Sequence, residues 1–367
     1  MLTANSKLGH LRNTRGSALL AVLWLAAGLA AIAFSVSTMV RGESERVSTS
    51  AEGLRAGYLA QGAIERGILW MIWGSGGETG QRPDGTIRFW KLGQPRMIMA
   101  FPSGDAVVEV IPEATKYDVN TISVDALTKL LLILGALPDR ASQLARAIDD
   151  WRKPVPPGGS GAFDSYYFGL GPTFRPRHAS IQEIEELLLV QGMTPELFYG
   201  NYLTSAEGRL YSRGGVRDCL SVWGSQGPFD VNTASPAVLE AVGIAEPVVQ
   251  AIIARRQTEP FEKMSDLQAL AGPTPKVTIG GGGTMYTLRA TARLRRPGGA
   301  YSDVVRTAAA TIKLLDQRKS PSPLDVVRYY DDAWTQTLAV PFVGMPRAGG
   351  NAVGQSGFVG RPARGAQ

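Results

Sequence analysis

The first pattern along the chain is an apolar run that passes into an amphipathic helix. Residues 17–40 carry no charged side chain. A helix of that length spans roughly 36 Å at about 1.5 Å per residue, enough to cross a hydrocarbon core of about 30 Å. Apolar residues then recur at helical spacing, namely Val47, Ala51, Leu54 and Tyr58. The pattern predicts one helix over about residues 17–73, apolar on all sides at first and amphipathic afterwards.

Alternating apolar and polar positions predict β-strands on both sides of a central region. Residues 86–90 and 105–111 are rich in β-branched and aromatic side chains. The clearest strand covers residues 286–295, where apolar residues alternate with Thr and Arg, so that one face is expected to contact water. The turn Pro297-Gly298-Gly299 follows, and residues 303–315 are expected to return as the antiparallel partner.

The centre of the chain is helical and contains an internal repeat. Asp118-Val119-Asn120-Thr121 recurs as Asp230-Val231-Asn232-Thr233, and each copy precedes an amphipathic helix, over residues 140–151 and 247–256. Further helix starts are predicted from N-cap residues and capping boxes, at Ser180-x-x-Glu183, Thr194-Pro195, Ser235-Pro236 and Ser265-x-x-Gln268. Asn120 and Asn232 are expected to hydrogen-bond nearby backbone at these helix starts. Residues 119–270 therefore look like a helical domain inserted into an α+β domain.

The amino-acid composition excludes several classes of function. The chain has two histidines, His10 and His178, and one cysteine, Cys219, too few for a His-ligated zinc site, a cysteine cluster or an internal disulfide. Enzymes of the familiar metal or triad kinds are not expected. His178 is interpreted as a structural loop histidine, and Cys219 as a free or buried thiol. The net charge of +6 is carried by the two ends, so the body between them is neutral and has no basic field to attract a polyanion.

The amino-terminal junction resembles that of type IV prepilins and pseudopilins. A short basic leader ends in Arg15-Gly16, and the apolar run begins at once with Ser17. In that family a membrane peptidase cleaves after the glycine and methylates the new amino terminus. The resemblance therefore implies cleavage between Gly16 and Ser17, with Ser17 as the N-methylated end. A secretory signal peptide is the alternative, but its apolar region usually has only about 7–15 residues.

Further phrases are similar to the K-type minor pseudopilins of type II secretion. Most pilins carry Glu at the fifth position of the mature protein. This chain has Ala21 at that position, and the lack of Glu there is typical of the K-type subfamily. The phrases follow one another in the family's order: Val-Asn-Thr twice, residues 147–152, residues 174–177 and residues 185–195. The resemblance implies an α+β, type IV pilin-like fold with a long N-terminal transmembrane helix and an antiparallel sheet, interrupted by a large inserted all-α domain.

The patterns and the resemblance together divide the chain into successive parts. They are a cleaved leader (1–16), the transmembrane assembly helix (17–40), its periplasmic continuation (41–75), the first part of the pilin-like α+β domain (76–118), the inserted helical domain with two Val-Asn-Thr units (119–270), the C-terminal strands of the pilin-like domain (271–316), and a linker with a disordered tail (317–367).

The resemblance also implies a location in the cell and a role in type II secretion. It implies a single-pass protein of the inner membrane, with its amino terminus in the cytoplasm and its bulk in the periplasm, which the basic residues before the apolar run also favour. It implies no catalysis, but a position at the tip of the type II secretion pseudopilus, where the protein initiates assembly and limits growth. The implied partners are the I-type and J-type minor pseudopilins, the major pseudopilin, the inner-membrane assembly platform and the prepilin peptidase.

Two other roles stay open from the sequence. The repeats are similar to helix-hairpin-helix modules, which would suit a DNA receptor of a competence-type pilus, and Arg255 and Arg256 would be the first residues to test for DNA contact. However, both hairpins lack the second glycine and Pro138 removes an N–H donor, so nucleic acid is not expected as a partner. A membrane-anchored protein that binds peptidoglycan or exoproteins without any filament is the third interpretation.

A cation site is the remaining candidate. Asp149, Asp150 and Asp164 flank the loop of residues 153–163, and oxygen-rich loops are natural ligands of calcium. The alternative is that Asp150 pairs with Arg152 or caps the loop. The sequence leaves calcium binding open and points to no other cofactor.

Overall fold

The computed structural model describes residues 15–75, 89–171, 174–204, 210–274, 276–280, 283–315, 320, 322–331 and 333. The chain forms two compact units, residues 1–54 and residues 55–367. Most of the predicted leader, residues 1–14, lies outside the described residues, as does the predicted tail from residue 334 onward.

The first unit consists of the amino-terminal part of helix α1 (Arg15–Ser75), which continues into the second unit. This helix confirms the single long helix predicted over residues 17–73. The described side chains from Ala18 to Ala51 are all exposed, and many of them are large and apolar. Within α1, the stretch Ala18–Gly74 has a window of mean hydropathy 2.4, and it is long and apolar enough to cross a membrane. A membrane would cover this apolar surface.

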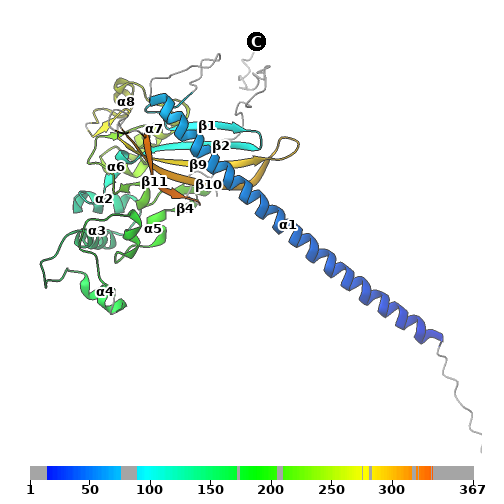
Figure 1. Ribbon diagram of the computed structural model, residues 1–367. Helices are drawn as coiled ribbons and strands as arrows, with labels where there is room; N and C mark the ends of the chain where they lie inside the picture. The colour runs from blue at the N-terminus through cyan, green and yellow to red at the C-terminus, as the bar shows by residue number, and fades with distance from the viewer. Residues whose placement is uncertain are drawn as a thin grey trace, which may run out of the picture. The chain divides into compact units, whose positions relative to one another are not determined.

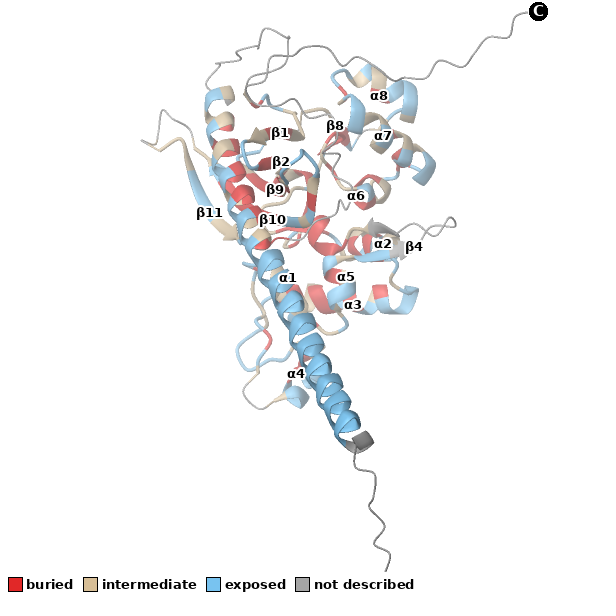
Figure 2. Cartoon of the chain, turned by 90° about the vertical axis from the view of Figure 1, so that its right-hand side faces the viewer, coloured by how far each residue is buried: buried red, intermediate tan, exposed pale blue. Residues whose placement is uncertain are grey.

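The second unit is built on a five-stranded antiparallel sheet with strand order β1-β2-β9-β10-β11. The strands are β1 (Arg96–Phe101), β2 (Gly104–Pro112), β9 (Met285–Arg295), β10 (Tyr301–Leu314) and β11 (Leu324–Tyr330). The carboxyl-terminal part of α1 lies across one face of this sheet (Figures 1 and 2). Small residues of α1 such as Ala60 and Ala63 share a buried core there with Leu288, Ala290 and Ala310.

Several strand predictions are confirmed and others are wrong. β2 confirms the strand at residues 105–111, and β9 and β10 confirm the predicted hairpin. In the strand predicted at residues 86–90, residues 86–88 lie outside the described part, and Phe89 and Trp90 belong to no strand. β1 was not predicted. β11 falls within the range 317–367 that the sequence assigns to a linker and tail, so that assignment is wrong for β11.

The polar face of β9 is buried from Thr287 to Thr291, so the expectation of a face in contact with water is wrong there, whereas Arg293 and Arg295 are half-buried. Thr287, Arg289 and Thr291 are 2–3% exposed. Successive residues of a strand point to opposite faces, so these side chains lie on the face away from α1. A period of two identifies a polar face but does not say whether water or another part of the chain covers it.

The region between β2 and β9 is mainly helical and has a core of its own. Its α-helices are α2 (Val124–Ile133), α3 (Pro138–Arg152), α4 (Asp164–Leu170), α5 (Pro195–Tyr199), α6 (Pro236–Ala241), α7 (Glu246–Thr258) and α8 (Met264–Ala271). Three 3-10 helices, η1 (Glu113–Thr115), η2 (Ile184–Leu189) and η3 (Val216–Asp218), join them. Figure 2 shows buried residues along the inner sides of α2, α3 and α6.

Short strands pair in this region as well. β3 (Tyr117–Asp118) is parallel to β6 (Leu220–Ser221), and β7 (Phe229–Asp230) is parallel to β8 (Val277–Thr278). β4 (Asn201–Thr204) and β5 (Leu210–Arg213) form an antiparallel pair. β3 and β7 end at Asp118 and Asp230, the first residues of the two repeats, so each repeat begins at the end of a short parallel strand.

The predicted helix starts are confirmed in part. The Ser235 hydroxyl accepts a hydrogen bond from the Val238 N–H at 3.3 Å, as expected of an N-cap, and α5 begins at Pro195. The capping box from Ser180 is wrong, because η2 begins at Ile184 after Glu183 and is a 3-10 helix. The start at Ser265 is also wrong, because α8 already begins at Met264.

Candidate functional site

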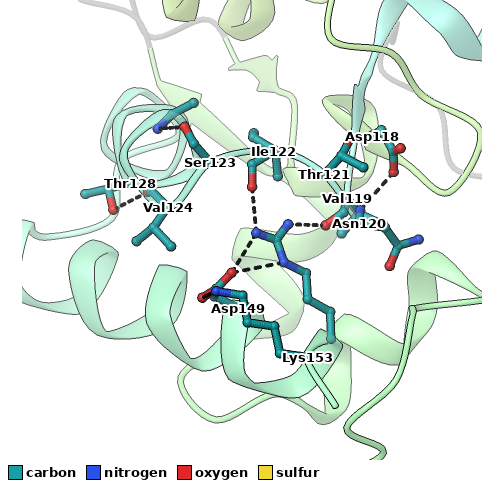
Figure 3. A network of polar contacts seen from close by, with 12 residues as sticks. Asp118, Val119, Asn120, Thr121, Ile122, Ser123, Val124, Thr128, Asp149 and Lys153 are labelled. Atoms are coloured by element: carbon teal, nitrogen blue, oxygen red, sulfur yellow. Dashed lines mark hydrogen bonds and ion pairs between the residues drawn. The ribbon is translucent and has the colours of Figure 1, made fainter.

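The two repeats open with the same backbone turn. The Asn120 N–H donates to Asp118 Oδ1 at 2.8 Å, and the Asn232 N–H donates to Asp230 Oδ1 at 3.2 Å. An aspartate that bonds the backbone two residues on forms an Asx-turn, which directs the chain from the strand into the next helix. Figure 3 shows the first of these turns, with Asp118, Asn120 and the start of α2.

The asparagine of each repeat then holds a distant segment. Asn120 Nδ2 donates to the Ile181 carbonyl at 3.0 Å, and its Oδ1 accepts from the Ile181 N–H at 2.7 Å. Asn232 makes the same pair of bonds with Phe261, at 2.9 and 2.8 Å. The expectation that these asparagines bond backbone is confirmed, but the expectation that the backbone lies nearby in sequence is wrong.

An arginine completes each repeat from the helix that follows. Arg152 in α3 donates to the Val119 carbonyl at 2.7 Å and to the Ile122 carbonyl at 2.6 Å (Figure 3). Arg256 in α7 donates to the carbonyls of Val231 and Ala234 at 2.8 and 2.7 Å. Burial lowers the pKa of Arg256 to about 10. Its guanidinium therefore binds the protein's own backbone rather than an external phosphate.

The hairpins after α2 and α6 also use their N–H groups internally. Gly135 and Ala136 donate to the carbonyls of Leu132 and Leu131, and Gly243 and Ile244 donate in the same way to Glu240 and Leu239. Gly135 and Gly243 have φ values of 89° and 106°, which only glycine adopts readily. A hairpin whose N–H groups close its own helix has none of them left for a phosphate. In both repeats these four N–H groups are therefore engaged within the protein.

Arg255 differs from Arg256. Its side chain is 36% exposed, lies over the Phe261 ring at 4.6 Å and pairs with Asp266 at 3.5 Å. Of the two arginines that the sequence singles out for DNA contact, the structure therefore places Arg256 inside the second repeat and leaves Arg255 near the surface.

A layer of polar side chains, buried except for the half-buried Glu185 and Arg328, joins the helical region to the sheet. We call it the polar seam, and it consists of Glu113, Lys116, Glu185, Arg217, Thr287 and Arg328. Thr287 on β9 donates to Glu113 at 2.6 Å, and Lys116 pairs with Glu113 at 3.0 Å. Arg217 and Arg328 reach Glu185 at 3.0 and 3.1 Å, the first from η3 and the second from β11.

The electrostatics of the polar seam favour its charged state. Burial alone would raise the pKa of the Glu113 carboxyl, but Lys116 and the hydrogen bonds from Ser221, Thr287 and Lys116 outweigh it, so the pKa is lowered. A cavity of about 30 Å³ lies within the polar seam. A space of this size is on the scale of one or two water molecules and is too small for an organic ligand.

The three aspartates proposed for calcium do not act together. Asp149 pairs with Arg152 at 2.7 Å and with Lys153 at 2.6 Å. Burial would raise the pKa of Asp149, but the hydrogen bonds from Lys153 and Arg152 lower it. Asp150 Oδ1 accepts from the Ala162 N–H at 3.0 Å, so Asp150 caps the loop, which was one of the two alternatives left open.

The structure instead groups Asp150 and Asp164 with His178. Donor atoms of these three residues lie within 4.8 Å of one another. His178 Nε2 lies 2.8 Å from Asp164 Oδ1, and Nδ1 lies 3.1 Å from the Asp150 carbonyl. Burial would lower the pKa of His178, but these bonds and the two negative charges raise it. Sequence reasoning missed this partnership, because nothing in the local pattern connects His178 with residues so far before it.

Two models of one protein family match the chain, in the order of the two repeats. One model of type II secretion system protein K matches residues 106–200, which hold the first repeat, and a second matches residues 229–279, which hold the second. The chain carries both of these domains of type II secretion system protein K.

The chain was also compared with curated proteins and with solved structures. A search of the curated proteins finds no match. Among solved structures, the K protein is similar to a chain of the GspK-GspI-GspJ complex from the type 2 secretion system of enterotoxigenic Escherichia coli, at 15% identity and a TM-score of 0.45. That match covers 77% of this chain and 98% of the other.

The remaining candidate residues of the K protein lie at its amino terminus and between the repeats. The backbone of Gly16 and Ser17 belongs to α1, and the leader before them lies outside the described residues, so cleavage between Gly16 and Ser17 stays a prediction. Cys219 is a free, buried thiol whose Sγ lies 3.2 Å from the Ser235 hydroxyl, and burial raises its pKa to about 12. This confirms the expectation of a free or buried thiol.

Proposed function

We propose that this K protein is the minor pseudopilin at the tip of the type II secretion pseudopilus, where it initiates assembly and limits growth. Its two protein K domains support a part in type II secretion. One observation supports the tip position. The helical region lies on the face of the sheet opposite α1, because Leu288 faces α1 while its neighbour Thr287 faces the polar seam.

The physical argument concerns the direction in which a filament can grow. In a filament of this kind, α1 packs against the equivalent helices of other subunits, and the sheet domain stands outside them. A further subunit above the K protein would have to share space with the helical region, which the polar seam fixes to the sheet. Growth then continues only from the membrane side, so the K protein enters first and stays at the end. The role needs no catalytic residue and no cofactor.

The proposed place in the membrane follows from the amino terminus. The apolar part of α1 crosses the inner membrane once, with the basic leader in the cytoplasm and the remainder in the periplasm. The prepilin peptidase would cut between Gly16 and Ser17 and methylate the new end. The proposed partners are the I-type and J-type minor pseudopilins, the major pseudopilin and the inner-membrane assembly platform.

A first experiment tests the partners. A soluble fragment of residues 42–333, which keeps β11 and the contacts of Arg328, is mixed with the soluble I-type and J-type minor pseudopilins and passed over a size-exclusion column. A stable three-protein complex is expected. Duplex DNA is included in a parallel run at about 0.15 M salt, where electrostatic binding is still measurable. A DNA complex without the protein complex would replace the tip proposal with the competence-receptor alternative.

A second experiment tests the limit on growth. The major pseudopilin is overproduced together with increasing amounts of the full-length K protein, and filament lengths are measured by electron microscopy. Each tip protein starts one filament, so more K protein should give more and shorter filaments. Filament lengths that do not depend on the amount of K protein would contradict the capping role even if the three-protein complex forms.

A further inference from the structure

The cluster of Asp150, Asp164 and His178 joins three segments of the helical region. Asp150 lies near the end of α3, Asp164 is the first residue of α4, and His178 follows α4. The side chains of His178 and Asp164 are only 10% and 7% exposed. The chain between Asp150 and Asp164 contains the loop of residues 153–163, which is rich in proline and glycine and has little core of its own.

The carboxylates of the cluster hold the end of this loop directly. Asp164 Oδ2 accepts from the Gly161 N–H at 2.8 Å, and Asp150 accepts from the N–H groups of Ala162 and Phe163 at 3.0 and 3.4 Å. The remaining oxygen of Asp164 faces the imidazole of His178. All four carboxylate oxygens therefore have a partner within the protein.

This donor set does not fit calcium. Calcium takes six to eight oxygen ligands as a rule. Asp149 is held by Arg152 and Lys153, and the third member of the cluster offers ring nitrogens rather than oxygens. The imidazole of His178 itself contacts the Asp164 carboxylate and the backbone carbonyl of Asp150.

Both ring nitrogens of His178 face hydrogen-bond acceptors. Nε2 faces a carboxylate and Nδ1 faces a backbone carbonyl, and both of these groups are acceptors. Only an imidazolium, which carries a proton on each nitrogen, donates to both at once. The titratable groups that face the ring are Asp164 on α4 and Asp150 on α3, and the Tyr167 phenol lies near both aspartates.

The backbone around the ring is built for this contact. His178 has a φ of 46°, the one non-glycine residue with positive φ in the described part of the chain. Such a conformation persists where the surroundings hold it in place. A Cβ on Gly161 would lie 2.4 Å from His178 Cε1 and 2.5 Å from Asp150 Oδ2, so the loop can approach the ring only with glycine at this position.

We propose that the imidazole of His178, placed between Asp150 and Asp164, closes the loop of residues 153–163 without a divalent cation. We call this arrangement the histidine clasp. It fixes the loop end and the start of α4, whose Tyr166, Phe168 and Leu170 are exposed. The inserted helical region of this K protein therefore keeps its shape in the presence of chelators, whichever role the protein has in the filament.

The test measures hydrogen–deuterium exchange in the full-length chain, purified in detergent, on peptides that cover residues 150–181. Exchange is compared in EDTA and in about 5 mM calcium, which fills even the weak sites of extracellular proteins. The wild-type chain is expected to protect the amides of residues 161–163 equally in both buffers. His178→Ala is expected to exchange them about tenfold faster in both buffers, because the loop then opens more often.

Two further variants separate the clasp from a general loss of stability. Gly161→Ala disturbs the clasp without removing any of its three polar groups and should speed exchange of the same amides. His10→Ala, made in the precursor that still carries residues 1–16, changes the only other histidine of the chain and should leave their exchange unchanged. Stronger protection of the wild type in calcium than in EDTA would overturn the proposal. Wild-type protection in His178→Ala would overturn it too, and if that variant does not fold, the wild-type comparison and Gly161→Ala decide.

Discussion

Arg152 and Arg256 make the same contact in the two repeats. Each guanidinium donates to two backbone carbonyls of the turn that opens its own repeat. Arg152 lies 33 residues after the first of these carbonyls, whereas Arg256 lies only 25 residues after its counterpart. The equivalence is therefore one of geometry and not of spacing. In each repeat the arginine fixes the Asp-Val-Asn-Thr turn against the helix that carries the arginine, which is α3 or α7.

The first prediction concerns Arg256. Arg256→Met keeps most of the apolar contact but leaves the carbonyls of Val231 and Ala234 without their donor. Unsatisfied buried carbonyls cost about 1–3 kcal/mol, so the free energy of unfolding should fall by about that amount. Both bonds come from one nitrogen, Nη1. Arg256→Lys should nevertheless recover only part of the loss, because the ammonium of the shorter lysine side chain does not reach the position of Nη1. Denaturant unfolding monitored by circular dichroism measures both effects.

Arg255→Met is the matched control for this prediction. Arg255 is half-buried and its ion pair with Asp266 is long, so the change should cost less than about 1 kcal/mol. An equal loss of stability in Arg255→Met and Arg256→Met would show that the bonds of Arg256 to the turn contribute no more stability than the contacts of Arg255.

The second prediction concerns the buried pair on the polar face of β9. Arg289 Nε donates to Glu109 at 2.8 Å, and the Arg289 side chain is 2% exposed. Glu109→Gln removes the charge that Arg289 faces and should destabilise the sheet by about 2–4 kcal/mol, because a buried charge loses its partner. Replacing both residues, Glu109→Leu with Arg289→Met, should cost less than the single change. Thermal unfolding of the three proteins decides, and a loss in the double variant as large as that in Glu109→Gln would contradict the coupling.

The third prediction concerns Cys219. Its thiol is buried, and burial raises its pKa to about 12, so the reactive thiolate is scarce at neutral pH. The native protein should react with a thiol reagent at least about a hundredfold more slowly than the unfolded chain, in which an ordinary thiol has a pKa of about 8.5. Absorbance after addition of the reagent, with and without denaturant, gives both rates. Fast labelling of the native protein would show that this part of the core opens readily.

Local patterns predicted the elements whose causes are local. α1, the hairpin of β9 and β10, and the helices after each repeat follow from apolar periodicity alone, and Ser235 caps α6 as its sequence position suggests. The repeats themselves were visible as a phrase. The structural role of the repeated residues was not visible. Asn120 and Asn232 bond Ile181 and Phe261, and these two partners are not part of the repeated sequence.

Features that depend on which segments meet could not be predicted. The polar residues of β9 look like a face in contact with water until the helical region covers them with Glu113 and Arg217. β11 continues the sheet although its surroundings in sequence look like a linker. His178 lies 14 residues after Asp164 and 28 residues after Asp150 in the sequence, and only the fold brings its ring to these groups.

The fourth prediction concerns acid stability and Glu113 of the polar seam. Its pKa lies below the ordinary value of 4.5, so the folded state holds this proton less tightly than the unfolded chain does. The resulting stabilisation is complete above pH 4.5, where both states are ionised, and is lost as the pH falls through the folded pKa. Glu113→Gln should therefore be less stable than wild type at neutral pH, and the difference should shrink as the solution becomes more acidic.

Asp149→Asn is the matched comparison for Glu113, since the pKa of Asp149 is lowered as well but its carboxylate lies near the surface of α3. Salt screens its pairs with Arg152 and Lys153 more than those of the polar seam. The pH dependence of unfolding is measured for wild type and both variants at low and high ionic strength. The Glu113 effect should persist in high salt while the Asp149 effect weakens. If both effects weaken equally, the polar seam is open to solvent and cannot hold the helical region rigidly on the sheet.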